Sequence, residues 1–284
     1  MLWLLRAGWL SLPFTAGAVV SDGLEGRSTA VAAVLASAVW IAWGVTLLAT
    51  LVPHAMTLTV VRSFAPAAAL ATALAAVAEG SIGLLGAVGL ASVAAVNAIA
   101  FTPLVGEAFV DASSYGTERR MPLRAPLAVL LGPVELVWAL GLAGLVAGPV
   151  LLAGRHWALG AVLTPVGLGI AFAAARSLHS LSRRWVVFVP AGLVLHDPLS
   201  LVDPVLFTRQ HIAHLGPAAP GSRAVDLGLH TRGLSLEMRL VEKTKLPRRR
   251  PGRPEHTELA NAVLFAPSRP SALLAEARHR HIPT

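Results

Sequence analysis

The pattern of hydrophobic and polar positions changes partway along the chain. The first two thirds contain long runs without a formal charge, among them Ser28–Val61 with 34 residues and Gly80–Gly106 with 27. A membrane-spanning helix needs about 20 predominantly apolar residues, and it satisfies its own backbone hydrogen bonds in lipid. The runs do not alternate between apolar and polar residues as the strands of an outer-membrane barrel would. The pattern therefore predicts several transmembrane helices.

Charges, prolines and glycines divide these runs into about six predicted spans. Pro53 indicates a tight turn inside the longest run, because proline disfavours helix in the residue before it. The predicted spans cover residues 2–20, 30–52, 55–78, 80–104, 126–150 and 157–177. A signal peptide is the alternative for the first span, with Ala16–Ala18 as the cleavage site. However, Leu2–Leu5 precede Arg6, which reverses the usual charged-then-apolar order.

The last third of the chain reads as a β domain. Short runs of β-branched and apolar residues lie between turn signals from Arg183 onward, and the strict alternation over 234–241 is typical of a half-buried antiparallel strand. Strands are predicted over 184–189, 192–196, 203–208, 210–215, 223–229, 234–241 and 259–266. An amphipathic helix is predicted over 269–281, with Ser268 as its N-cap. The predicted fold is an α-helical polytopic membrane bundle over residues 1–180, followed by a small antiparallel β domain over 181–284 with a C-terminal helix.

Composition and charge support this division. Hydrophobic residues make up 55% of the chain and charged residues 13%, against about 25% charged residues in a soluble domain. A soluble single domain is therefore excluded. The absence of cysteine excludes disulfides and thiolate catalysis. Residues 1–180 hold 8 arginines and 7 acids, whereas residues 181–284 hold 15 basic residues and 8 acids, so the net charge of +8 belongs almost wholly to the β domain.

The arginines also predict the orientation. Arg119, Arg120 and Arg124 follow the fourth predicted span, and Arg183 and Arg184 follow the last. Lys and Arg near the ends of spans favour the cytoplasmic side. We therefore expect a multi-pass protein of the bacterial inner membrane, with the β domain in the cytoplasm and the lipid bilayer as its first partner.

Two charges fall inside predicted spans. Glu135 lies about 9 residues into the fifth span and Arg62 about 7 residues into the third, so at about 1.5 Å per residue their depths agree within a few ångströms. An intramembrane acid is costly unless it is paired or protonated. We predict an Arg62–Glu135 ion pair that fixes helix packing, and a proton or ion pathway through the two residues is the alternative.

Other candidate chemistry is sparse. Glu107 and Asp111 share one helical face and could bind a cation or act in a membrane-embedded enzyme, but we favour a solvated cytoplasmic loop in which acids and arginines pair locally. His211 and His214 are three apart, which places them on opposite faces of a strand. No set of about four metal ligands is recognisable. We therefore expect no enzyme activity, no metal and no cofactor.

The segment 243–258 carries the densest charge. Pro247, Pro251 and Pro254 interrupt it, and we predict a flexible loop because proline breaks regular structure. Contact with anionic lipid headgroups is a possible role for its four arginines, which are Arg248, Arg249, Arg250 and Arg253. Nucleic-acid binding is disfavoured, because no aromatic residues alternate with these arginines to stack on bases.

The strand order of the last third resembles a bacterial PH-like domain. Trp185–Leu195 and Leu264–Leu274 carry this resemblance, and Gly106–Arg124 and Arg183–Asp197 look like a family of uncharacterised actinobacterial membrane proteins. The resemblance implies a PH-like fold and supplies no catalytic residues. Phosphoinositide-binding PH domains use basic residues in the first hairpin, whereas the turn Pro190–Gly192 has none, so inositide binding is not expected.

Three functions follow from these patterns. The leading one is regulation, scaffolding or binding of an unidentified protein partner through the cytoplasmic β domain. The second is a small transporter or channel with Glu135 and Arg62 in its pathway. The third is a membrane-embedded enzyme that uses Glu107 and Asp111.

Overall fold

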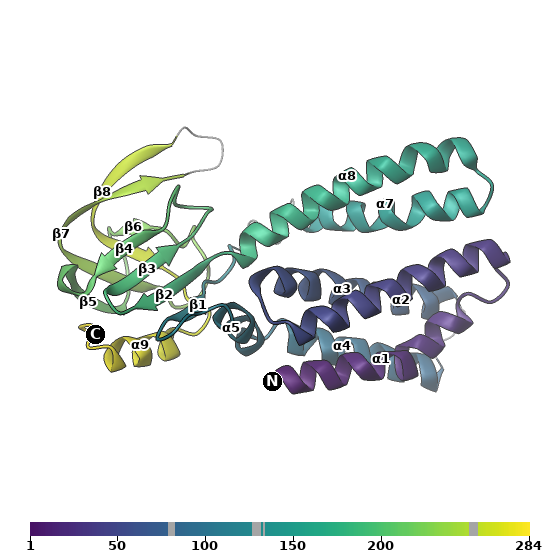
Figure 1. Cartoon of the computed structure of the whole chain (residues 1–284), viewed down its shortest axis with the longest axis horizontal. Helices are drawn as coiled ribbons and strands as arrows, with labels where there is room; N and C mark the ends of the chain where they lie inside the picture. Colours follow the sequence, from purple (N-terminus) through teal and green to yellow (C-terminus); the bar gives the residue numbers. More distant parts are fainter. Residues whose placement is uncertain (79–82, 127–131, 133, 250–254) are drawn as a thin grey trace. The chain divides into compact units, whose positions relative to one another are not determined.

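The chain folds into two compact units, each assembled from two separate stretches of sequence. The structure is a computed structural model that describes residues 1–78, 83–126, 132, 134–249 and 255–284. The first unit comprises Met1–Ala108 and Pro133–Leu178, and the second comprises Phe109–Gly132 and His179–Thr284 (Figure 1). The two stretches of the second unit flank the last two long helices in sequence.

The first unit consists of long apolar helices. They are α1 (Leu2–Asp22), α2 (Thr29–Leu51), α3 (Ala55–Ala78), α4 (Leu84–Ala100), α7 (Glu135–Ala153) and α8 (Trp157–Ser182). A short helix, α5 (Pro103–Asp111), follows α4 after a bend of 55°. In the described part of the chain, five helices have the length and composition to cross a membrane, or six if α4 and α5 form one broken span. The predicted long apolar helices are therefore confirmed, in a number of five to six among the described residues.

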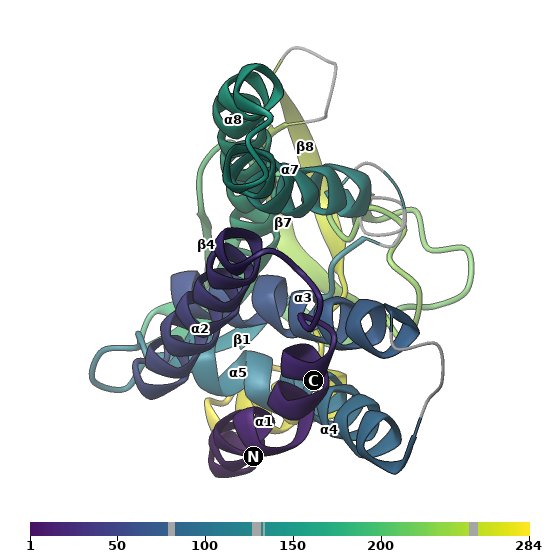
Figure 2. The same ribbon diagram turned by 90° about the vertical axis from the view of Figure 1, so that its right-hand side faces the viewer.

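Helix α1 is an integral member of the bundle. Its buried residues recur at helical spacing along one face, and they are Leu5, Trp9, Leu12, Ala16 and Val19. Figure 2 looks almost along the helix axes and shows α1 grouped with α2, α3 and α4. Position 16, which the signal-peptide alternative placed at a cleavage site, is part of this packed face.

Helices α7 and α8 form a close antiparallel hairpin, seen side by side in Figures 1 and 2. A Cβ atom added to Gly144 would lie 2.5 Å from the Cα atom of Gly167, and one added to Gly141 would lie 2.8 Å from the Cα atom of Ala171. Small residues allow backbones in a membrane to approach this closely. The glycines of α7 therefore set the distance between these two helices.

The second unit contains two four-stranded sheets. Their strands are β1 (Arg119–Pro122), β2 (Trp185–Val189), β3 (Gly192–His196), β4 (Val205–Thr208), β5 (Ile212–Pro217), β6 (Val225–Asp226), β7 (Leu236–Arg248) and β8 (His256–Phe265). The short 3-10 turn η2 (Arg209–His211) precedes β5, and helix α9 (Pro270–His279) ends the fold. The sheet orders are β1-β2-β3-β4 and β5-β7-β8-β6. The predicted strands and C-terminal helix are confirmed with shifted boundaries.

Strand β1 lies between the fourth and fifth predicted spans, in a segment where no strand is predicted from the sequence. It pairs antiparallel with β2, with Arg120 opposite Val187 and Pro122 opposite Trp185. The backbone continues the pairing beyond the strand, because Leu123 donates to the carbonyl of Arg184 at 2.9 Å. The second unit therefore includes Phe109–Gly132 in addition to the predicted 181–284.

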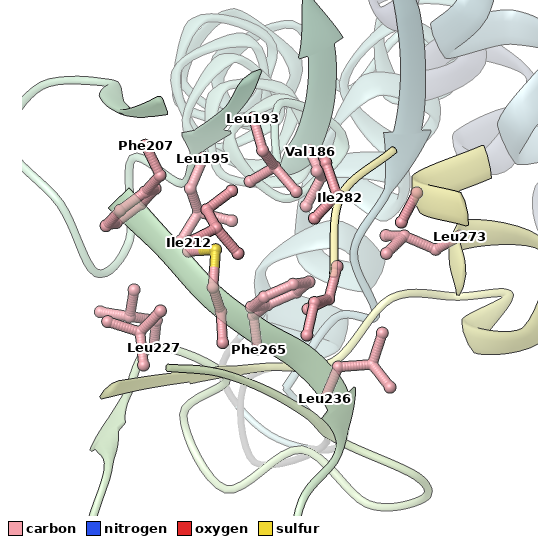
Figure 3. Close-up of a cluster of buried hydrophobic side chains, with 14 of the residues drawn as sticks. Val186, Leu193, Leu195, Phe207, Ile212, Leu227, Leu236, Phe265, Leu273 and Ile282 are labelled. Carbon is pink, nitrogen blue, oxygen red and sulfur yellow. The ribbon is translucent and has the colours of Figure 1, made fainter. Parts of the chain in front are cut away.

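The two sheets enclose one hydrophobic core. Figure 3 shows Val186, Leu193, Leu195 and Phe207 of the first sheet facing Leu236 and Phe265 of the second, with Leu273 of α9 closing one side. Met121 of β1 also belongs to this cluster and is 2% exposed. The core of the β domain is thus incomplete without the segment that precedes α7.

Strands β7 and β8 extend far into the segment predicted as a flexible loop. Arg248 pairs with His256 and Pro247 with Thr257, so the loop prediction is wrong for 243–248 and 256–258, and residues 250–254 lie outside the described residues. On the side away from β8, residues 247–249 pair with residues 200–202, because Val202 donates to the carbonyl of Pro247 at 2.9 Å and Arg249 donates to the carbonyl of Ser200 at 3.0 Å. Pro247 contributes its carbonyl to this short contact, which proline can do without an N–H.

Candidate functional site

Two arginines of the first unit, Arg6 and Arg62, bind the C-terminal ends of helices. Arg6 donates from Nε and Nη2 to the carbonyl of Thr50, at 3.0 and 2.9 Å, near the end of α2. Arg62 donates from Nε to the carbonyl of Ala100 at 3.4 Å, at the end of α4. The last carbonyls of a helix lack intrahelical partners, and they carry partial negative charge that a cation stabilises. Arg6 therefore stabilises the C-terminal end of α2, and Arg62 stabilises that of α4.

Arg62 occupies the break between α4 and α5. Its guanidinium lies 5.6 Å from the centre of the Phe101 ring, and a Cβ atom on Gly106 would come within 2.8 Å of Nη2. The glycine thus leaves room for the arginine beside the bent chain. Broken helices in membranes need such partners, because their freed backbone groups cannot bond to lipid.

Glu135 is the first residue of α7 and is exposed. Three residues later, Trp138 donates from Nε1 to the carbonyl of Ser63 at 3.2 Å, so the start of α7 lies at nearly the same level as Arg62 on α3. The interactions of the described residues include no contact between Arg62 and Glu135. Their ion pair stays a prediction.

The acids of α5 have separate surroundings. Glu107 is buried, with 5% of its surface exposed. Asp111 accepts hydrogen bonds from the Ser114 hydroxyl at 3.0 Å and from the Arg120 backbone N–H at 2.8 Å. Its carboxylate thereby fixes the turn that leads into β1.

Asp111 also lines an open, polar cleft of about 470 Å³ in the second unit. The other charged or titratable lining residues are Glu118, Arg119, Glu276, His279 and Arg280. Arg280 pairs with Glu276 at 2.6 Å and also donates to the carbonyl of Thr117. The arginine therefore ties helix α9 to the loop before β1, and its charge is already compensated by protein groups.

A buried ion pair lies where the two stretches of the second unit meet. Arg184 and Asp197 make a bidentate pair at 2.8 and 2.7 Å, with 1% and 0% of their side chains exposed. The same guanidinium donates to the carbonyl of Arg124 at 2.7 Å. Charge-assisted bidentate bonds are among the strongest hydrogen bonds in proteins. Arg184 therefore holds the chain that leaves β1 against the chain that enters β2.

An aromatic stack lies next to this pair on β2 and β3. The rings of Trp185 and His196 are 4.8 Å apart and inclined by 20°, and Arg120 lies 6.0 Å from the Trp185 ring. Burial lowers the pKa of His196 below its ordinary value, nearby Arg183 and Arg120 lower it further, and Asp197 opposes the shift. His196 Nε2 is buried without a hydrogen-bond partner among the described residues. Burial and the neighbouring arginines therefore disfavour protonation of the imidazole.

The four arginines predicted to contact anionic lipid have different environments. The Arg248 side chain is 2% exposed, lies 3.5 Å from Glu258 and donates to the carbonyl of Asp226 at 3.0 Å. Arg249 is exposed and pairs with Glu255 at 2.8 Å. Arg250 and Arg253 lie outside the described residues. The Arg248 side chain thus makes its contacts inside the β domain, and a contact between Arg248 and lipid is not supported.

Sequence reasoning missed β1, the Arg184–Asp197 pair and the Trp185–His196 stack. The alternation of Arg120, Met121 and Pro122 is too short to indicate a strand alone. Among the described residues, no group of three or more His, Cys, Asp or Glu side chains could hold a metal ion. Comparisons with protein-family models, curated proteins and solved structures find no match, so the resemblances stated above stay predictions.

Proposed function

We propose that this multi-span membrane protein acts in regulation, scaffolding or partner binding through its β domain, and that it is not an enzyme. The pairing of β1 with β2 carries the proposal. These adjacent antiparallel strands are joined in sequence through α7 and α8, whereas such strands elsewhere are usually joined by a short turn. The α7–α8 hairpin is therefore inserted between two paired strands of the β domain, and both of its ends are attached to that domain.

This connection favours a regulatory or scaffolding role. The Arg184–Asp197 pair and its bond to Arg124 hold both ends of the α7–α8 hairpin within one domain. A displacement of one hairpin helix along its axis would act directly on the β1–β2 register. A partner that binds the domain could in turn bias the hairpin, because coupling between sites is reciprocal.

We extend the proposal to a PH-like fold and a cytoplasmic orientation. Two four-stranded sheets closed by helix α9 support this fold, whereas the parallel pairing of β6 with β8 departs from the predicted antiparallel domain. The arginines of the 104–125 and 176–184 segments favour the cytoplasm. Because β1 and β2 pair directly, the segments that carry them lie on the same side of the membrane.

Experiments on the full-length protein in its native membrane test both the cytoplasmic orientation and the binding of a partner. Reporter fusions at residues 23, 115 and 284 should place 115 and 284 inside the cell and 23 outside. A photo-crosslinking residue at exposed Leu206 or Leu234 of the β domain should give discrete protein adducts. An external reporter at 284 would overturn the orientation, and a lack of adducts from all domain positions would overturn partner binding.

Transport is a second candidate, favoured by one observation. The bend of 55° between α4 and α5, with Arg62 at the break, resembles the discontinuous helices that bind substrates in transporters. Flux through liposomes containing the purified protein tests this candidate. Loss of flux in a stably folded Glu135→Gln protein would support a pathway, and a protein without measurable flux would exclude it for the ions tried.

A further inference from the structure

The β7–β8 ribbon has two chemically different faces. In its outer half, Lys245 pairs with Leu259 and Leu246 pairs with Glu258. Side chains alternate between the faces of a strand, so Leu246, Arg248 and Ala260 share the buried face, and the residues between them share the opposite one. The opposite face is exposed and is called the outer ribbon face here; it comprises Lys243, Lys245, Thr257, Leu259 and Asn261.

The outer ribbon face combines positive charge with an exposed apolar side chain. Lys243 and Lys245 are the two lysines of the sequence, and neither forms an ion pair with a residue that the structure describes. Leu259, directly opposite Lys245, is 60% exposed. The arginines nearby are used differently, because Arg248 is buried and Arg249 pairs with Glu255.

We propose that the outer ribbon face binds an anionic lipid surface, with Lys243 and Lys245 at the headgroups and Leu259 at their apolar boundary. Basic residues are attracted to acidic headgroups, and an apolar side chain beside them adds burial at the interface. The aliphatic stems of lysine suit the same boundary. Exposed Glu242, next to Lys243, is the acid that weakens this attraction.

The proposal deepens the proposed function, because it rests on the cytoplasmic orientation. Anionic lipids are concentrated in the cytoplasmic leaflet, and the protein is anchored in that membrane by its own spans. The contact would hold the end of the ribbon at the surface while other faces of the domain remain available to a partner. It adds Lys243 and Lys245 to the residues predicted to contact anionic lipid.

The absence of cysteine makes a direct test possible. Full-length Leu259→Cys protein is labelled with a polarity-sensitive fluorophore and placed in nanodiscs of phosphatidylcholine, with or without phosphatidylglycerol. We expect a blue shift of the emission in the anionic discs that high salt reverses, since salt screens such attraction. The same label at Leu234→Cys, on another exposed part of the domain, is the matched control and should not shift.

A second variant separates charge from folding. Lys243→Ser and Lys245→Ser together should abolish the shift at position 259 while the melting transition of the protein stays unchanged. Equal emission in both kinds of disc would overturn the proposal. Shielding of the label in both kinds of disc would also overturn it, because it would indicate that a protein surface covers Leu259. Aggregation of the double variant with its lipid response intact would overturn it as well, because it would indicate that the lysines only protect a strand edge. Both disc leaflets carry the same lipids, so failure here is distinct from failure of the topology experiment.

Discussion

Trp9 of α1 and Trp43 of α2 each donate an indole N–H to the backbone carbonyl of the other, at 2.9 and 3.0 Å. Trp9 is almost fully buried. The two hydrogen bonds are polar contacts between neighbouring spans. A buried indole usually requires such a partner, and the reciprocal pair fixes the register of α1 against α2.

Replacing either tryptophan by phenylalanine should weaken this contact. Each variant loses one interhelical hydrogen bond, and bonds of this kind contribute on the order of 0.6 kcal/mol in membrane proteins. Thermal unfolding in detergent should show a small, similar loss of stability for Trp9→Phe and Trp43→Phe. Trp157→Phe, at an exposed position, serves as the control and should leave the transition unchanged.

Enlarging Gly144 should separate the α7–α8 hairpin. A methyl group there would overlap the backbone of Gly167, and overpacking typically costs about 1–3 kcal/mol. Gly144→Ala should therefore lower the unfolding temperature. Gly169→Ala, where an added Cβ meets nothing within 4 Å, is the matched control on the partner helix. Equal behaviour of the two variants would contradict the close approach.

Breaking the Arg184–Asp197 pair should unfold the β domain. Loss of one member leaves the other charge buried and unpaired, which costs about 3–5 kcal/mol. Arg184→Leu and Asp197→Leu should each make the domain sensitive to protease. Combining the two should recover part of the stability, because no unpaired charge remains. Arg249→Leu, at an exposed pair with Glu255, should have little effect.

His196 should make the stability of the β domain depend on pH. Its pKa is lowered in the folded state by burial and by Arg183, so the unfolded chain binds a proton more readily. The contribution is fully present above the unfolded pKa of about 6.5 and is lost as the pH falls from there towards the folded pKa. Chemical unfolding between neutral and mildly acidic pH should show this loss. It should disappear in His196→Gln and persist in His230→Gln, whose side chain is 97% exposed.

The spans could be predicted because hydrophobic runs of this length have few alternative structures in water or lipid. Predicted and observed bounds of α3, 55–78, coincide. Polar contacts inside the bundle were harder to anticipate. The hydrogen bond from Arg62 to the carbonyl of Ala100 is an example, because this acceptor is available only where α4 ends.

Strand β1 escaped prediction because its stability comes from a distant partner. Met121 reads as one apolar residue among charges, and it is buried only through pairing with β2, more than sixty residues later in the sequence. Arg184 illustrates the same limit. In the sequence, Arg184 is one of several positive charges that follow the last span. In the fold, its charge is neutralised by an ion pair with Asp197.

The most direct test of the central claim is whether the β domain needs β1 to fold. Leu123 lies beside Arg184, so a three-residue Gly-Ser-Gly linker can join residue 124 to residue 184 in place of the α7–α8 hairpin. We predict that the linked protein, residues 109–124 and 184–284, is soluble and unfolds cooperatively, whereas 184–284 alone aggregates or lacks a transition. Equally cooperative unfolding of both proteins would contradict a domain built from two stretches of the chain.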